Sequence, residues 1–120
     1  MKLKNQKLLA AHRILERWAV SIGSGLPTEE WDDVPKSRPP PLPDDIAIVV
    51  DQIVCKSPRR WQRIIRNWYC TPKPTEIIAR ENSCSTDTVP RYWHAALEHA
   101  NSQFVARRVI LRLYGDAEVA

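Results

Sequence analysis

The fold is decided by residues 75–99, which read TEIIARENSCSTDTVPRYWHAALEH. Apolar side chains at 77–79 predict a short helix over residues 75–81, and residues 82–84 are polar or small, as in a tight turn. A second apolar stripe begins at Val89 and continues at 96–97. Two helices that pack through such faces across a short turn are typical of a helix-turn-helix, with an ordinary helical hairpin as the alternative.

Polar side chains gather around the start of the second helix of this motif. In a helix-turn-helix protein that end enters the major groove, where arginine binds guanine through two hydrogen bonds and short hydroxyls reach bases or phosphates. The candidate DNA-binding residues are Lys73, Thr75, Ser85, Thr86, Asp87, Thr88, Arg91, Tyr92 and His94.

Pro90 limits where this second helix can begin. Inside a helix a proline removes a backbone hydrogen bond, whereas in the first turn no donor is needed. We therefore expect the helix to begin late, at Thr88 with Asp87 as its cap, or to be kinked at Pro90.

The N-terminal third predicts one helix and a proline-rich connector. Residues 8–22 carry apolar side chains at helical spacing, and the glycines at 23 and 25 end the pattern. Residues 27–43 contain six prolines, which cannot continue a helix. We expect an N-terminal helix within 1–26, an acidic and proline-rich connector at 27–43, and a helical domain at 44–120.

Two helical patterns precede the helix-turn-helix, and one extends beyond it. Asp44 and Asp45 are expected to cap the first, and Ser57 and Pro58 to serve as N-cap and first residue of the second, which ends near residue 69. The last pattern runs to residue 114, with an interruption expected around 101–102. No strand pattern competes, so the sequence predicts an all-α fold. The tryptophans expected in its core are Trp18, Trp61, Trp68 and Trp93.

Charge is distributed unevenly along the 120 residues. The formal net charge is +4, and residues 56–112 contain eleven basic and four acidic side chains. This bias is typical of a protein that binds a polyanion. One group of arginines on the polar side of the second pattern is either a solvated face or a phosphate-contacting surface: Arg59, Arg60, Arg63 and Arg66.

Several function classes lack their sequence patterns. No nucleophile elbow, phosphate loop or paired-carboxylate motif occurs, so we expect no enzyme activity and no small-molecule substrate. The three cysteines form no CxxC pair, and reduced, mostly buried thiols are expected without metal or cofactor. The longest apolar run is residues 46–50, too short to cross a bilayer, so the sequence predicts a cytoplasmic protein without membrane contact.

Residues 15–18, Leu-Glu-Arg-Trp, are similar to the LERWG motif that opens the phage late-gene antitermination Q proteins of the small helix-turn-helix type. The agreement continues at corresponding distances over about residues 15–104. The further matching segments are Arg38-Pro39, Asp44-Asp45, Trp68-Tyr69, 75–79, Val89 and 96–100. The helix-turn-helix part resembles region 4 of sigma factors equally well.

The resemblance implies a mechanism and two partners. Such proteins bind double-stranded DNA overlapping a promoter, engage bacterial RNA polymerase that has paused just downstream with its sigma factor, and join the elongation complex. Transcription then reads through terminators. The candidate polymerase contacts are Arg17, Trp31 and Arg38, of which Trp31 lies in an acidic segment, 29–33. The location implied is the cytoplasm of a bacterial host, with a phage or prophage origin.

Two other function classes stay open. A conventional helix-turn-helix repressor or activator would bind its operator tightly without polymerase. A protein-binding module, such as a polymerase inhibitor, would ignore DNA. Trp31 could equally fold back on its own domain.

Overall fold

The computed structural model describes residues 8–23, 39–71 and 73–114. Within these ranges every regular element is helical and no strand occurs, which confirms the all-α prediction. No helix there is long and apolar enough to cross a membrane. In chain order the elements are α1 (Leu9–Ser21), α2 (Asp44–Lys56), α3 (Arg59–Ile65), η2 (Arg66–Cys70), α4 (Thr75–Glu81), α5 (Val89–Ala106) and α6 (Val109–Tyr114).

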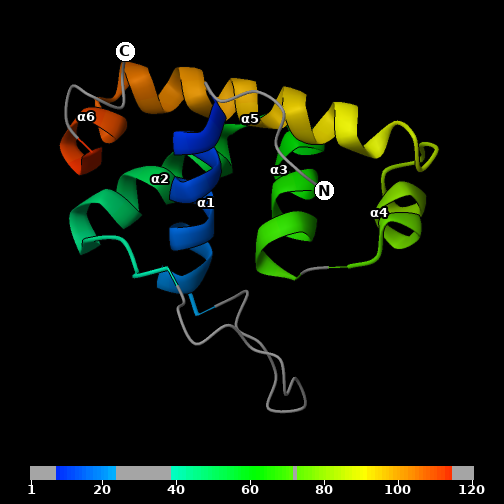
Figure 1. Ribbon diagram of the computed structural model, residues 1–120, viewed down its shortest axis with the longest axis horizontal. Coiled ribbons are helices and arrows are strands. Elements are labelled where there is room, and N and C mark those ends of the chain that lie inside the picture. The colour runs from blue at the N-terminus through cyan, green and yellow to red at the C-terminus, as the bar shows by residue number, and fades with distance from the viewer. Residues whose placement is uncertain (1–7, 24–38, 72, 115–120) are drawn as a thin grey trace.

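Helix α5 organises the fold, because every other α-helix contacts it. Figure 1 shows α5 running along one side of the molecule with α1, α2 and α3 beneath it, α4 at its N-terminal end and α6 at its C-terminal end. Trp18, Trp93 and Phe104 are fully buried in a single hydrophobic cluster. The core prediction is confirmed for Trp18 and Trp93, whereas Trp61 and Trp68 are half-buried at its edge.

Two of the predicted helix caps are wrong. Helix α2 begins at Asp44 itself, after Pro43, so Asp44 and Asp45 lie in its first turn, where the helix dipole favours carboxylates. Helix α3 begins at Arg59 after Pro58. Ser57 instead belongs to the end of α2, because its hydroxyl is buried and donates to the Ile53 carbonyl oxygen at 2.8 Å.

The helix that starts at α3 changes its winding before it ends. From Arg66 to Cys70 the backbone forms a π-helical turn, closed by the Thr71 N–H donating to the Arg66 carbonyl oxygen at 2.9 Å. A π turn inserts one residue into a helix and shifts the side chains that follow. Trp68 thereby stacks on Trp93 with ring centroids 4.4 Å apart, while Tyr69 next to it is buried.

The expected interruption at 101–102 is wrong, because α5 continues to Ala106. The helix is unbroken between Ala100 and Phe104, which lie about one turn apart and are both buried. The chain turns at Arg108, whose φ of 58° is left-handed, and α6 folds back to bury Val109 and Ile110. Arg112 of α6 then pairs with Asp45 in the first turn of α2.

Candidate nucleic-acid interface

Helix α4 has the predicted bounds and ends in a tight left-handed turn. Ser83 has a φ of 54°, the Cys84 N–H donates to the Ala79 carbonyl oxygen at 3.0 Å, and the Ser83 N–H donates to that of Arg80 at 3.3 Å. This pair of bonds is the Schellman arrangement that satisfies the last carbonyls of a helix. Ile78 and Ala79 are buried, so α4 is fixed beneath the start of α5.

The late start predicted for the second helix is confirmed within one residue. Helix α5 begins at Val89, and Pro90 occupies its second position, where a missing N–H leaves no bond unmade. Residues 85–88 form one further turn, in which the Ser85 and Thr88 hydroxyls are 2.8 Å apart and the Thr88 N–H donates to the Ser85 carbonyl oxygen at 3.0 Å. Thr88, rather than Asp87, is the residue that flanks the helix.

The candidate DNA-binding residues fall into two groups. Ser85, Thr86, Asp87 and Arg91 are exposed around the first turn of α5, and the Arg91 side chain makes no hydrogen bond or ion pair with the described residues. Thr88 is half-buried next to them. Residues 85–88 and Arg91 together form the α5 start.

The second group, Tyr92, His94 and Thr75, is half-buried. Tyr92 is half-buried, with the Arg60 guanidinium 4.9 Å from its ring centroid and the Trp61 ring edge-on at 6.0 Å. His94 is half-buried and stands edge-on to Trp93 at 5.7 Å. Thr75 is half-buried in the first turn of α4.

Lys73 is held by an ion pair that also involves α3 and its π turn. Its ammonium lies 2.7 Å from Glu81 Oε1, and Glu81 Oε2 accepts a hydrogen bond from Asn67 Nδ2 at 3.0 Å. The Arg63 guanidinium donates to the Glu81 carbonyl oxygen at 3.1 Å. The hydrogen bond from Lys73 is the main reason that the pKa of Glu81 lies below its usual value. These contacts tie the end of α4 to α3.

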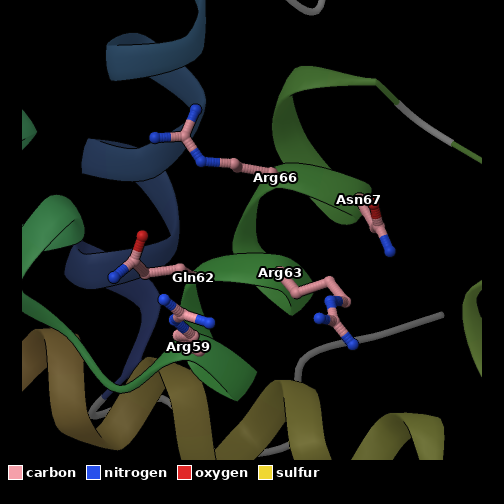
Figure 2. A pocket seen from close by; sticks show the side chains of 5 residues that line it. All are labelled: Arg59, Gln62, Arg63, Arg66 and Asn67. Carbon is pink, nitrogen blue, oxygen red and sulfur yellow. The ribbon is translucent and has the colours of Figure 1, made fainter. Parts of the chain in front are cut away.

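The four arginines of α3 and its π turn are all exposed, as predicted for either interpretation of them. A shallow hollow of about 350 Å³ is lined by Arg59, Arg63 and Arg66, together with Gln62 and Asn67. Figure 2 shows the guanidinium groups of Arg59 and Arg66 reaching to one side of α3 and that of Arg63 to the other. Gln62 is fixed there, since its amide donates to the Ser57 carbonyl oxygen at 2.6 Å.

Of the three candidate polymerase contacts, only Arg17 lies within the described residues; Trp31 and Arg38 lie outside them. Arg17 donates from Nε to the Pro40 carbonyl oxygen at 3.1 Å, from Nη2 to that of Pro41 at 3.3 Å, and from Nη1 to the Tyr114 hydroxyl at 3.3 Å. Its side chain therefore joins α1, residues 40–41 and α6. The signal for this role is the run of prolines, whose extended backbone makes no internal hydrogen bonds and leaves its carbonyls in need of donors.

A buried chain of hydrogen bonds was not predicted from the sequence. Trp93 Nε1 donates to the Tyr69 hydroxyl at 3.1 Å, and that hydroxyl lies 2.7 Å from His12 Nδ1. The Glu16 carboxylate can only accept, so His12 Nε2–H faces it at 3.2 Å, and in the neutral imidazole Nδ1 then accepts from the Tyr69 hydroxyl. Burial is the main cause of a lowered pKa of His12 and a raised pKa of Tyr69. These hydrogen bonds connect α5 to α1 through Tyr69 of the π turn.

The thiols differ from expectation. Cys55 is exposed, and Cys70 and Cys84 are half-buried, so the prediction of mostly buried cysteines is wrong. Burial raises the pKa of the Cys70 thiol.

No protein-family model, curated protein or solved structure matches this chain.

Proposed function

We propose that this chain is a transcription antitermination factor that binds promoter-proximal DNA through a helix-turn-helix formed by α4 and α5. The observation that carries the DNA-binding part is the α5 start. Ser85, Thr86 and Arg91 are exposed and Thr88 is half-buried, while Val89 and Trp93 on the opposite side of the same helix are buried. A rigidly held helix with free polar groups at its N-terminal end suits the major groove, where each bidentate arginine contact discriminates by about 1–3 kcal/mol.

The connection between α4 and α5 is longer than in the usual motif. A helix-turn-helix commonly has three or four residues between its helices, whereas seven, residues 82–88, separate α4 from α5 here. Four of the seven form the extra turn at 85–88, which leads directly into α5. Pro90 accounts for the difference, because it provides no N–H to bond the carbonyl four residues earlier.

The polymerase part of the proposal rests on the resemblance to the Q proteins and on the need for a second contact beside the helix-turn-helix. A single helix-turn-helix makes few base contacts, so its DNA affinity alone is modest. A second contact, to paused polymerase, raises occupancy through effective concentration. Arg17 is engaged within the protein, and the remaining candidates for that contact are Trp31 and Arg38.

The decisive experiment is transcription in vitro with bacterial RNA polymerase. The DNA site is first selected from a randomised duplex library, and is then placed beside a promoter with a downstream pause and a terminator. We expect read-through that requires the site, falls with Arg91→Ala, and is lost when the site is moved far from the promoter. Strong repression without read-through would instead indicate a conventional repressor, and an effect that ignores the DNA site would indicate a protein-binding module.

The polymerase contact is tested separately by replacing residues 24–38 with a glycine-serine linker of equal length. This segment runs between Gly23 and Pro39 and contains both remaining candidates. The variant should keep its DNA affinity and its unfolding midpoint, and lose read-through. Read-through at the wild-type level would refute a contact made by Trp31 or Arg38.

A further inference from the structure

Arg59 and Arg63 of α3 and Arg66 of the π turn carry positive charge that no ion pair within the described ranges neutralises, although Arg63 also helps to lower the pKa of Glu81. Arg59, Arg63 and Arg66 are exposed, and none of them takes part in an ion pair within the described ranges. Arg63 donates only to the Glu81 main-chain carbonyl, and Arg66 approaches only the Cys55 thiol, at 4.0 Å. Three such charges within eight residues create a strongly positive surface that favours an anionic ligand.

The spacing of these arginines suits neighbouring phosphates of a DNA strand. Residues at i, i+4 and i+7 share one helix face and extend over about 10 Å at a rise of 1.5 Å per residue. One strand of duplex DNA carries one phosphate per 3.4 Å of rise and winds around the axis, so its successive phosphates are further apart than this, and long arginine side chains are needed to reach neighbouring ones from this length of helix. Figure 2 shows the guanidinium groups of Arg59 and Arg66 on one side of α3 and that of Arg63 on the other, and all three side chains line the hollow.

We propose that Arg59, Arg63 and Arg66 bind successive phosphates of one strand of duplex DNA, as a second DNA contact outside α4 and α5. The proposal rests on the proposed function, since it extends the DNA contact made by the α5 start. Asn67 and Arg63 bond to Glu81 at the end of α4, so the two contacts are held in a fixed relation to each other.

The composition of the α3 surface favours a duplex over other polyanionic or acidic partners. Protein interfaces are built around apolar and aromatic side chains, but the exposed large apolar residues among those described, Ile22, Ile48, Val105 and Leu111, all lie outside α3. Single strands bind by stacking their bases on aromatic rings. Trp61 and Trp68 are half-buried, with their rings against Tyr92 and Trp93, and so do not present such a platform.

Phosphate contacts raise affinity without reading sequence, and they make binding depend on salt. Each contact contributes about 0.9 to the slope of the logarithm of affinity against the logarithm of salt concentration. The triple variant Arg59→Gln, Arg63→Gln, Arg66→Gln should therefore reduce that slope by about three. Between about 50 and 200 mM salt, the wild-type chain should lose roughly 40-fold more affinity than the variant.

The test measures fluorescence anisotropy of a labelled random-sequence duplex with the full chain over this salt range. The matched control is Arg13→Gln, Arg107→Gln, Arg108→Gln, which removes the same charge from three exposed arginines elsewhere. The control should change the slope by less than one. The triple variant Arg59→Lys, Arg63→Lys, Arg66→Lys should restore the wild-type slope, because phosphate binding needs charge more than shape.

Equal slope changes in the α3 variant and the control would overturn the proposal, since charge alone would then explain both. A slope that Lys does not restore, or a larger effect on a single-stranded oligonucleotide than on the duplex, would overturn it as well. The DNA consensus selected by each protein distinguishes a failure of the phosphate contact from a failure of the proposed function. The α3 variant should select the wild-type consensus, whereas a wild-type chain that selects none would refute reading by the α5 start.

Discussion

Replacing Tyr69 by phenylalanine removes one hydroxyl from the buried hydrogen-bond chain and leaves the ring in place. The hydroxyl accepts from Trp93 Nε1 at 3.1 Å and lies 2.7 Å from His12 Nδ1, so it joins α1, the π turn and α5. A typical buried hydrogen bond contributes about 1 kcal/mol net, and a buried donor left without an acceptor costs about 1–3 kcal/mol. Because the Trp93 indole is fully buried, we expect Tyr69→Phe to lower the free energy of unfolding by about 2–4 kcal/mol.

Urea unfolding followed by tryptophan fluorescence measures this change. With a slope of about 1–3 kcal/mol per molar urea, the midpoint should fall by on the order of 1–2 M while the slope stays constant. The matched control is Tyr92→Phe, whose hydroxyl makes no hydrogen bond within the described residues, and it should change stability by less than about 0.5 kcal/mol. If both variants unfold at the wild-type midpoint, the Tyr69 hydroxyl does not stabilise the packing of α5 on α1.

Three further outcomes are expected for Trp18, Arg17 and His12. Trp18→Ala should destabilise the fold by about 3–5 kcal/mol in urea unfolding, because this indole is fully buried; loss of function at unchanged stability would make it a partner contact instead. Arg17→Ala should make residues 39–42 more sensitive to limited proteolysis, since their carbonyls lose two donors, whereas Arg13→Ala at an exposed site should not. Burial lowers the pKa of His12 in the folded state, so the unfolded chain binds its proton more readily; stability should be complete above about pH 6.5 and fall as the pH drops below it. His12→Gln should flatten this fall between about pH 7 and 5.5, and an unchanged pH profile would show that His12 does not cause it.

The bounds of α4 and the late start of α5 could be predicted because prolines mark both. Pro74 precedes α4, and Pro90 can occupy only the first turn of α5. The end of α5 could not be predicted from local composition. Asn101 and Ser102 have the polar character of a break, but the burial of residues on both sides keeps them helical, and this burial depends on how α5 lies in the core.

The candidate site was predicted in part for the same reason. The α5 start and the α3 arginines are local patterns, so their exposure follows from helical spacing. The contacts of Lys73 with Glu81 and of Tyr92 with Arg60 and Trp61 involve residues of other elements, and no periodicity reveals them. The bond from Tyr69 to His12 spans 57 positions, and that from Arg17 to Tyr114 spans 97. Such pairs are set by the tertiary fold.

The Leu-Glu-Arg-Trp segment, residues 15–18, makes its contacts within the protein. Leu15 and Trp18 are buried, Trp18 Nε1 donates to Asp51 at 3.4 Å, Glu16 lies beside His12, and Arg17 bonds to the backbone at 40–41. Each member of the segment therefore has a partner within the protein. Deleting residues 1–43 would remove α1 from the core and unfold the remainder, so such a deletion cannot separate DNA binding from action on polymerase. Replacing residues 24–38 keeps every member of the Leu-Glu-Arg-Trp segment in the chain, so this variant is the sharper test of the proposed polymerase contact.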